Sequence, residues 1–211
     1  MLATMTSMAR RERDALCNTA LVLGEDAPTL CAGWDARLLV AHLLVRERNP
    51  LAMPGIVLPP LSGLTDRLTA HAARTDFAVL VERLRTPSLP LALLDPLDRV
   101  VNTMEFYIHH EDLRRAQPDW TPRELSDGDQ ARLWANLKAV GKGLVRAVGV
   151  PVSLRWGSRT TTLNAGADGV EVSGLPSELA VLLYGRDQYL DVEVVGPPEA
   201  VARLLHTDLG I

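Results

Sequence analysis

The sequence predicts two domains of different class, a four-helix bundle followed by a small α+β domain. Between residues 7 and 116, apolar residues recur at helical spacing and are separated by proline-rich segments. After residue 122, short runs with the two-residue alternation of strands appear between helices. Only 4% of the 211 residues are aromatic, so Leu, Val and Ala must fill the core, which favours packed helices over an aromatic-rich sandwich.

The first domain is expected to hold four helices, because four stretches combine an amphipathic pattern with signals that start or stop a helix. They span 7–23, 36–48, 62–85 with a break near Thr75, and 98–116. Gly24 ends the first helix, and Asp35 is placed to cap the second. Two segments with several prolines are predicted to be irregular: 50–60, and the one that contains Pro87, Pro90 and Pro96.

A polar segment with two prolines, from Gln117 to Pro122, predicts a linker between residues 1–118 and a second domain over 124–211. Ser126 is expected to cap a helix over 127–148. Alternation, turn residues and helix-opening prolines predict the other elements: strands at 152–156, 160–163, 169–172 and 189–195, and helices over 177–184 and after Pro198. The sheet should be small and mainly antiparallel.

Composition excludes several classes of partner. The net charge is −4, and no basic stripe is present, which argues against nucleic acid. No stretch approaches the roughly 18 apolar residues of a membrane span, and Met1 to Arg13 lacks the apolar segment of a signal peptide. We therefore expect a cytoplasmic protein, as a monomer or a homodimer. Cys17 and Cys31 form no CxxC pair and are expected to be reduced, buried thiols.

One segment of the fourth predicted helix carries several groups capable of chemistry. At about 100° per residue, Glu105 and His109 differ by about 40°, and Asp112 returns to within about 20° of Glu105. All three therefore project from one face, close to the apolar side of the helix. An unpaired carboxylate facing the interior would be costly, and a bound metal would offset that cost.

A third candidate ligand is His42, which lies in the middle of the apolar second helix. His42, Glu105 and His109 would form an open site with three protein ligands, as in catalytic zinc centres, and would also suit nickel. The alternatives are a hydrogen-bonded core histidine for His42 and an ordinary surface pair for Glu105 and His109. His110 points about 100° away from His109 and is expected to flank the site. No H-E-x-x-H motif is present.

Several motifs in this order resemble a known family. They are Gly33-Trp34-Asp35 followed by His42, Glu105-x₃-His109-x₂-Asp112-Leu113, residues 173–179, and residues 182–186. Together they resemble the mycothiol-dependent maleylpyruvate isomerase family, which is similar to the wider group of DinB-like metal-binding bundles. The resemblance covers nearly the whole chain, and it implies a DinB-like four-helix bundle followed by a sterol-carrier-like α+β domain.

The resemblance implies a divalent metal, usually zinc, held by His42, Glu105 and His109. It also implies mycothiol, a small thiol of actinobacteria, as cofactor. By analogy Asp112 would help to hold the thiol, and Arg186 would bind its polar part or an acidic substrate. The endings of the second and fourth helices, 46–50 and 112–115, are typical of a subgroup whose reaction is unassigned. Maleylpyruvate is therefore not implied as the substrate.

Two functions remain open from the sequence. In the first, the metal activates a small thiol for attack on an electrophile, as in a mycothiol-dependent transferase or isomerase; no catalytic residue is assigned. In the second, the site binds or senses metal or thiol without turnover. A protein side chain as fourth ligand, with Asp112 or His110 the candidates, would favour the second function. Arg46, Arg48 and Arg186 are either candidates for holding a substrate carboxylate or solvated surface charges. The predicted sheet is too short for a large lipid cavity.

Overall fold

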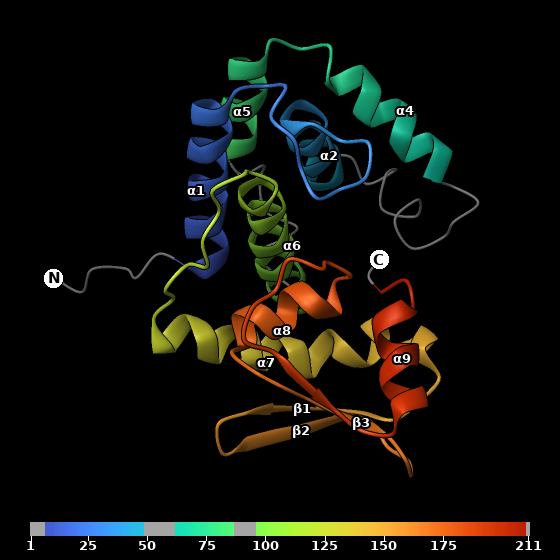
Figure 1. The fold of residues 1–211 in the computed structure, drawn as a ribbon. Helices are drawn as coiled ribbons and strands as arrows, with labels where there is room; N and C mark the ends of the chain where they lie inside the picture. The colour runs from blue at the N-terminus through green and yellow to red at the C-terminus, as the bar shows by residue number, and fades with distance from the viewer. Residues whose placement is uncertain (1–6, 49–61, 87–95, 210–211) are drawn as a thin grey trace, which may run out of the picture. The chain divides into compact units, whose positions relative to one another are not determined.

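The computed structural model describes residues 7–48, 62–86 and 96–209, which belong to two compact units, Met1–Thr121 and Pro122–Ile211 (Figure 1). The irregular segment predicted over 50–60 lies outside the described residues. So do Pro87 and Pro90 of the second predicted irregular segment. Within the described part of the chain, no helix is both long and apolar enough to cross a membrane.

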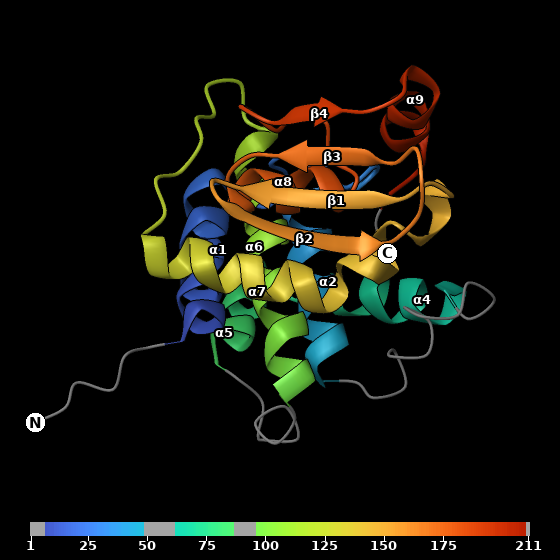
Figure 2. The same ribbon diagram turned by 90° about the horizontal axis from the view of Figure 1, so that it is seen from below.

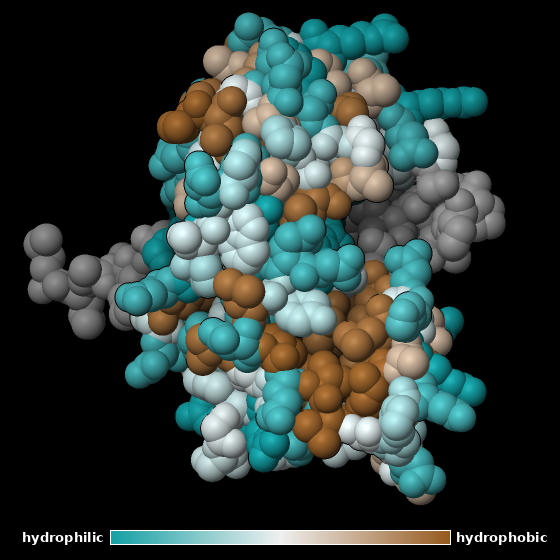
Figure 3. All heavy atoms as spheres, viewed as in Figure 1, coloured by the Kyte–Doolittle hydropathy of each residue, from teal (hydrophilic) through white to brown (hydrophobic). Residues whose placement is uncertain are grey.

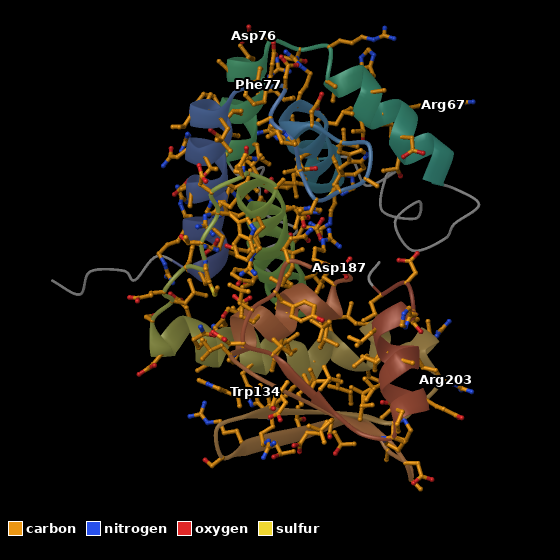
Figure 4. The ribbon with its side chains drawn as sticks, in the orientation of Figure 1. Arg67, Asp76, Phe77, Trp134, Asp187 and Arg203 are labelled. Atoms are coloured by element: carbon orange, nitrogen blue, oxygen red, sulfur yellow. The ribbon has the colours of Figure 1, made fainter. Side chains whose placement is uncertain are left out.

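The helices of the first unit follow the predicted order. They are α1 (Met8–Leu23), α2 (Ala36–Arg48), α4 (Ser62–Ala72), α5 (Phe77–Arg85) and α6 (Pro96–Arg115). Oδ1 of Asp35 accepts a hydrogen bond of 2.8 Å from the amide of Leu38, which confirms Asp35 as the cap of α2. Asp76 caps α5 in the same way and separates it from α4, so the predicted break near Thr75 is confirmed (Figure 4).

One prediction for this unit was wrong. Pro96 was assigned to an irregular connection, but it is the first residue of α6. Proline has no amide hydrogen to lose and a backbone angle that suits a helix, so the first turn accepts it.

Four of these helices share one apolar core. α1 packs along α6, and α5 contacts both α1 and α2, while α4 contacts α2 (Figure 1). The fully buried side chains of the core include Leu16, Leu39, Leu43, Leu80, Leu84, Phe106 and Leu113. The stripe predicted for α2 therefore faces a core that is completed by residues far apart in the sequence.

A buried arginine joins all four helices of this core. The guanidinium of Arg13 in α1 donates two hydrogen bonds, of 2.8 and 2.7 Å, to the carboxylate of Glu47 in α2. It also donates to the carbonyl of Leu84 in α5, and its Cζ atom lies 4.4 Å from the ring centroid of Phe106 in α6. Arg13 of α1 thus has one partner on each of α2, α5 and α6, and these contacts favour one relative position of the four helices.

The second unit consists of one sheet and several helices. Its elements are α7 (Asp127–Leu144), a 3₁₀ turn η3 (Arg146–Val148), β1 (Val152–Trp156), β2 (Arg159–Asn164), β3 (Val170–Ser173), α8 (Pro176–Leu183), β4 (Glu193–Val195) and α9 (Pro198–His206). The strand order is β2-β1-β3-β4 (Figure 2). β1 is antiparallel to β2 and parallel to β3, and β3 is antiparallel to β4, so the sheet is mainly antiparallel as predicted.

Helices α7 and α8 cover one face of the sheet (Figure 1). Trp134 of α7 lies between that helix and the strands, 6.1 Å from the ring of Trp156 in β1 (Figure 4). α7 also approaches β2 closely, because a Cβ at position 141 would lie 2.9 Å from a methyl group of Leu163. Glycine at 141 therefore permits this helix–strand contact.

One strand and one helix of the second unit are shorter than predicted. The strand expected over 189–195 is limited to Glu193–Val195. The amide of Leu190 donates instead to the carboxylate of Glu178 in α8, and Asp191 has a φ of 53°, which no strand residue adopts. The helix expected over 127–148 ends at Leu144 and continues only as the 3₁₀ turn.

The face drawn in Figure 3 mixes hydrophilic and apolar residues, and the apolar ones gather most in the lower half of the view. One exposed apolar group lies at the end of α1, where Leu21, Val22 and Leu23 are 42%, 84% and 38% exposed. Scattered apolar side chains of this kind are ordinary on protein surfaces, so they identify no partner.

Candidate metal centre

The three predicted metal ligands lie together in the first unit. His42 comes from the middle of α2, and Glu105 and His109 come from successive turns of α6. Nε2 of His42 lies 3.7 Å from Oε1 of Glu105, and Nε2 of His109 lies 3.4 Å from the same oxygen. Both imidazoles therefore direct the same ring nitrogen at one carboxylate oxygen, and the three candidate ligand atoms all lie within 4.8 Å of one another.

This donor set has the dimensions of a first-row metal site. Zinc binds nitrogen and oxygen at about 2.0–2.2 Å, so two ligand atoms of a tetrahedral shell lie about 3.4 Å apart. The observed nitrogen–oxygen distances of 3.4 and 3.7 Å fit that spacing. The side chains of His42, Glu105 and His109 are 14%, 18% and 13% exposed, so the group is sheltered but open to an ion. Zinc and nickel both accept such donors.

Asp112 and Cys31 contact the other nitrogen of His109. Oδ2 of Asp112 lies 2.9 Å from Nδ1 of His109, and the carboxylate is almost fully buried. The thiol of Cys31 donates to the same oxygen over 3.2 Å, and its sulfur lies 3.7 Å from Nδ1. A carboxylate at Nδ1 favours the tautomer that keeps a proton there and leaves the lone pair of Nε2 for a metal.

The same contacts set the charge of His109. Burial lowers the pKa of this imidazole, but hydrogen bonds with Asp112, Cys31 and Glu105 outweigh it and hold the pKa well above its ordinary value. In the metal-free protein His109 is therefore an imidazolium at neutral pH. A metal must displace the proton from Nε2 before it can bind there.

Arg46 supports Glu105 from the next turn of α2. Its Nε lies 3.2 Å from Oε1 of Glu105, and its Nη1 donates to Oδ1 of Asn102 over 3.0 Å. Burial raises the pKa of Glu105, but hydrogen bonds with His109 and His42 and the charge of Arg46 outweigh it, so the pKa lies well below its ordinary value. Glu105 is thus an anion, already held in place.

Two of these neighbours, Arg46 and Cys31, were not predicted to contact the candidate ligands. Arg46 was considered for a substrate carboxylate or for solvent, but it is buried beside Glu105. Its position one turn after His42 was an available signal. Trp34 packs on His42 with a centroid distance of 4.7 Å, and Cys31 is half-buried at His109, whereas only Cys17 is buried as predicted. The turn over residues 31–34 overlaps the Gly33-Trp34-Asp35 motif, but nothing in its sequence predicts that it contacts α6.

The other candidate residues are not directed at the point where the ring nitrogens of His42 and His109 meet Glu105. His110 contacts Glu12 through Nδ1 and Thr19 through Nε2, both at 3.0 Å in α1, so it flanks the site as predicted. Asp112 faces the ring nitrogen opposite to the one that faces Glu105. Neither side chain is directed at the point where the three candidate ligand atoms meet. Arg186 belongs to the second unit, where it donates to the carbonyl of Tyr184, and its role in cofactor binding stays a prediction.

Comparison with known proteins gives information on the fold. No protein-family model and no curated protein matches the chain. The solved structure of the mycothiol-dependent maleylpyruvate isomerase aligns with a TM-score of 0.59 and 18% identity, over 90% of this chain and 93% of that chain. A histidine-to-alanine mutant of that enzyme aligns over the same shares, with a TM-score of 0.58. The structure therefore confirms, at the level of the fold, the resemblance inferred from sequence: this chain is folded like the mycothiol-dependent maleylpyruvate isomerase.

Proposed function

We propose that the protein binds one divalent metal, zinc or nickel, through His42, Glu105 and His109, and uses it to activate a small thiol against an electrophile. The supporting observation is the convergence of two imidazole nitrogens on one carboxylate oxygen, at distances of 3.7 and 3.4 Å. A cation held there would lower the pKa of a coordinated thiol and supply a thiolate near neutral pH.

The residues around the ligands have separate tasks in this proposal. Asp112 keeps the proton of His109 on Nδ1, so that Nε2 stays directed at the metal position. Arg46, whose guanidinium also donates to Asn102, holds Glu105 in one orientation. Trp34 fixes the plane of the His42 ring by contact. Ligands that are positioned in advance need less ordering when the metal binds.

The thiol we propose is mycothiol, because the fold neighbour is described as mycothiol-dependent. Asp112 was the expected contact for the thiol, but its burial and its bond to His109 favour a positioning role. Arg186 remains the candidate for the polar part of the thiol or for an acidic substrate. The reaction is addition to, or displacement at, an electrophilic carbon, as in a transferase or an isomerase.

A second candidate is a metal- or thiol-sensing protein without turnover. It is favoured by Cys31, since a thiol beside a metal ligand can report on metal or redox state. An open coordination position favours catalysis instead, and neither Asp112 nor His110 closes the site with a fourth ligand. Catalytic turnover of an electrophile with mycothiol would show that the protein is an enzyme and not only a sensor.

Metal analysis of two variants tests the ligand assignment. Untagged wild-type protein should contain close to one zinc or nickel per chain, and His109→Ala should lose it. His71→Ala is the matched control, because His71 is an exposed histidine near the end of α4, another helix of the same unit. A His109→Ala variant that keeps stoichiometric metal would contradict the assignment.

Calorimetric titration of metal-loaded protein with mycothiol tests the thiol. Binding should be detectable with wild type and should be lost with the metal-free protein, because the thiolate needs the cation. If the metal-loaded protein gives neither heat nor a thermal shift with mycothiol, the thiol assignment is wrong even if the metal is present.

A further inference from the structure

His109 belongs to two groups of potential metal ligands, one on each side of its ring. The first contains His42 and Glu105 at Nε2. The second contains Cys31 and Asp112 at Nδ1, and its three candidate ligand atoms also lie within 4.8 Å of one another. The proposed function uses only the first group as metal ligands. The second group, which could also hold a metal, has no ligand role in it.

The dimensions of the second group suit a metal with one sulfur ligand. With zinc–sulfur and zinc–nitrogen bonds of about 2.3 and 2.05 Å, the two ligand atoms of a tetrahedral shell lie about 3.6 Å apart. Sγ of Cys31 lies 3.7 Å from Nδ1 of His109. The sulfur–oxygen and nitrogen–oxygen distances to Asp112, 3.2 and 2.9 Å, are now those of hydrogen bonds. They would widen by about half an ångström or less in a tetrahedral shell.

The charges favour a soft cation on this side. Cys31 as thiolate and Asp112 as carboxylate would supply two negative charges to a divalent ion. The first group supplies one, from Glu105, and the guanidinium of Arg46 lies 3.2 Å from that carboxylate. Thiolate ligands also select thiophilic metals such as cadmium and zinc. Cys31 is only half-buried, unlike Cys17, which is buried.

We propose that Cys31, Nδ1 of His109 and Asp112 form a second site, for a thiophilic divalent cation, that competes with the first. On binding, the metal–sulfur bond replaces the S–H bond and the metal–nitrogen bond replaces the Nδ1–H bond of His109, and both protons leave to solvent. Neutral imidazole has one N–H and one lone pair, so a metal on Nδ1 leaves the proton on Nε2. The ring can then no longer ligate a metal beside His42 and Glu105.

The second site itself stands without the proposed function, but its regulatory meaning rests on it. If the first group carries the working metal, a thiophilic ion at Cys31 would inhibit the protein by removing the ligand that both sites share. By reciprocity, a metal at the first site would weaken the second to the same degree.

Cadmium titration of the metal-free, full-length protein tests the proposal, with ultraviolet absorption of the thiolate–cadmium bond as the signal. Wild type should bind one Cd²⁺ in total and show the charge-transfer band. Cys31→Ser should still bind one Cd²⁺, at the first site, without the band. His42→Ala should bind one Cd²⁺ with the band at full strength, so that failure of the first site and failure of the second are distinguished.

Two controls make the outcome decisive. Cys17→Ser should leave the band unchanged, because the Cys17 thiol lies in the core and contacts the carbonyl of Val81. Thermal unfolding of each variant shows that it is folded, and alkylation of Cys31 in wild type should be blocked by one equivalent of Cd²⁺. A band that survives Cys31→Ser, or no band at all, would overturn the second site. Tight binding of two Cd²⁺ by wild type would overturn the competition.

Discussion

The carboxylate of Asp112 decides which nitrogen of His109 is available to a metal. Asp112→Asn should therefore weaken metal affinity by about tenfold to a hundredfold, since an amide holds the Nδ1 proton less firmly than a carboxylate. Competition with a coloured chelator would measure the change. Asp26→Asn is the matched control, because Asp26 is exposed. Equal affinities of the two variants would show that Asp112 does not position the ligand.

The pKa of His109 gives metal binding a defined dependence on pH. Because this pKa lies well above its ordinary value, the metal-free site carries a proton on Nε2 at neutral pH. Metal uptake should release that proton, and apparent affinity should fall by about tenfold for each unit of pH below the pKa of His109. Calorimetry in buffers of different ionisation enthalpy would measure the release. An affinity that does not change between pH 6 and pH 8 would contradict the protonated state.

The two thiols should differ in reactivity. Burial raises the pKa of Cys17 to about 12, so at pH 8 only about one molecule in ten thousand carries the thiolate. Iodoacetamide should label Cys31 well before Cys17 in the native protein, and both at similar rates after unfolding. Peptide mass spectrometry would follow the labelling. The raised pKa also means that the stabilising contribution of the protonated thiol is lost as pH rises from about 9 to about 12.

The sequence predicted His42, Glu105 and His109 as candidate ligands and placed Asp112 on the same face of the helix, but it did not predict the contacts that Arg46 and Cys31 make with them. Helical spacing alone places Glu105 and His109 on one face, and an apolar surrounding turns His42 inward. The approach of Cys31 and Trp34 depends on a turn between α1 and α2, including a bridge between Pro28 and Asp35, that has no local periodicity. Arg46 gave a misleading signal, because arginine is usually solvated and its partner lies 59 positions away, in α6.

At the scale of elements, Arg13 is the side chain on which helix packing most depends. Arg13→Ala leaves the buried carboxylate of Glu47 without its bidentate partner and should lower the free energy of unfolding by about 3–5 kcal/mol. Arg10→Ala on the exposed side of α1 should change it by about 0.5 kcal/mol or less. Urea denaturation would compare them. A small effect of Arg13→Ala would mean that water or another cation replaces the pair.

Most elements were predictable because caps and prolines fix their ends. Asp35, Ser126 and Pro198 each start a helix at or next to the expected residue. The errors came where tertiary contacts compete with local pattern. The alternating residues before β4 suited a strand, but the carboxylate of Glu178 takes the amide of Leu190. The parallel pairing of β1 with β3 likewise joins strands that are not consecutive in the chain, which no short-range signal reveals.

At the scale of the molecule, the candidate metal centre lies wholly within the first unit. His42, Glu105, His109 and their supporting residues all precede Thr121. We therefore expect a chain of residues 1–121 to bind metal with the affinity of the full protein. Metal titration of the shortened chain measures this, with His109→Ala in the same chain as control. Affinity reduced more than about tenfold in a shortened chain that is folded by circular dichroism would mean that the second unit helps to form the centre.

The placement of His42 on α2 and of Glu105 and His109 on α6 has a mechanical consequence. An ion held by all three would pin α2 to α6, which already meet at this point through the contacts of Arg46 and His42 with Glu105. A cation that binds only the folded chain adds about 4 kcal/mol when its concentration is a thousand times its dissociation constant. The melting temperature would then rise with the fraction of protein that holds the metal. In a cell that lacks the metal, the protein would be less stable and more readily degraded.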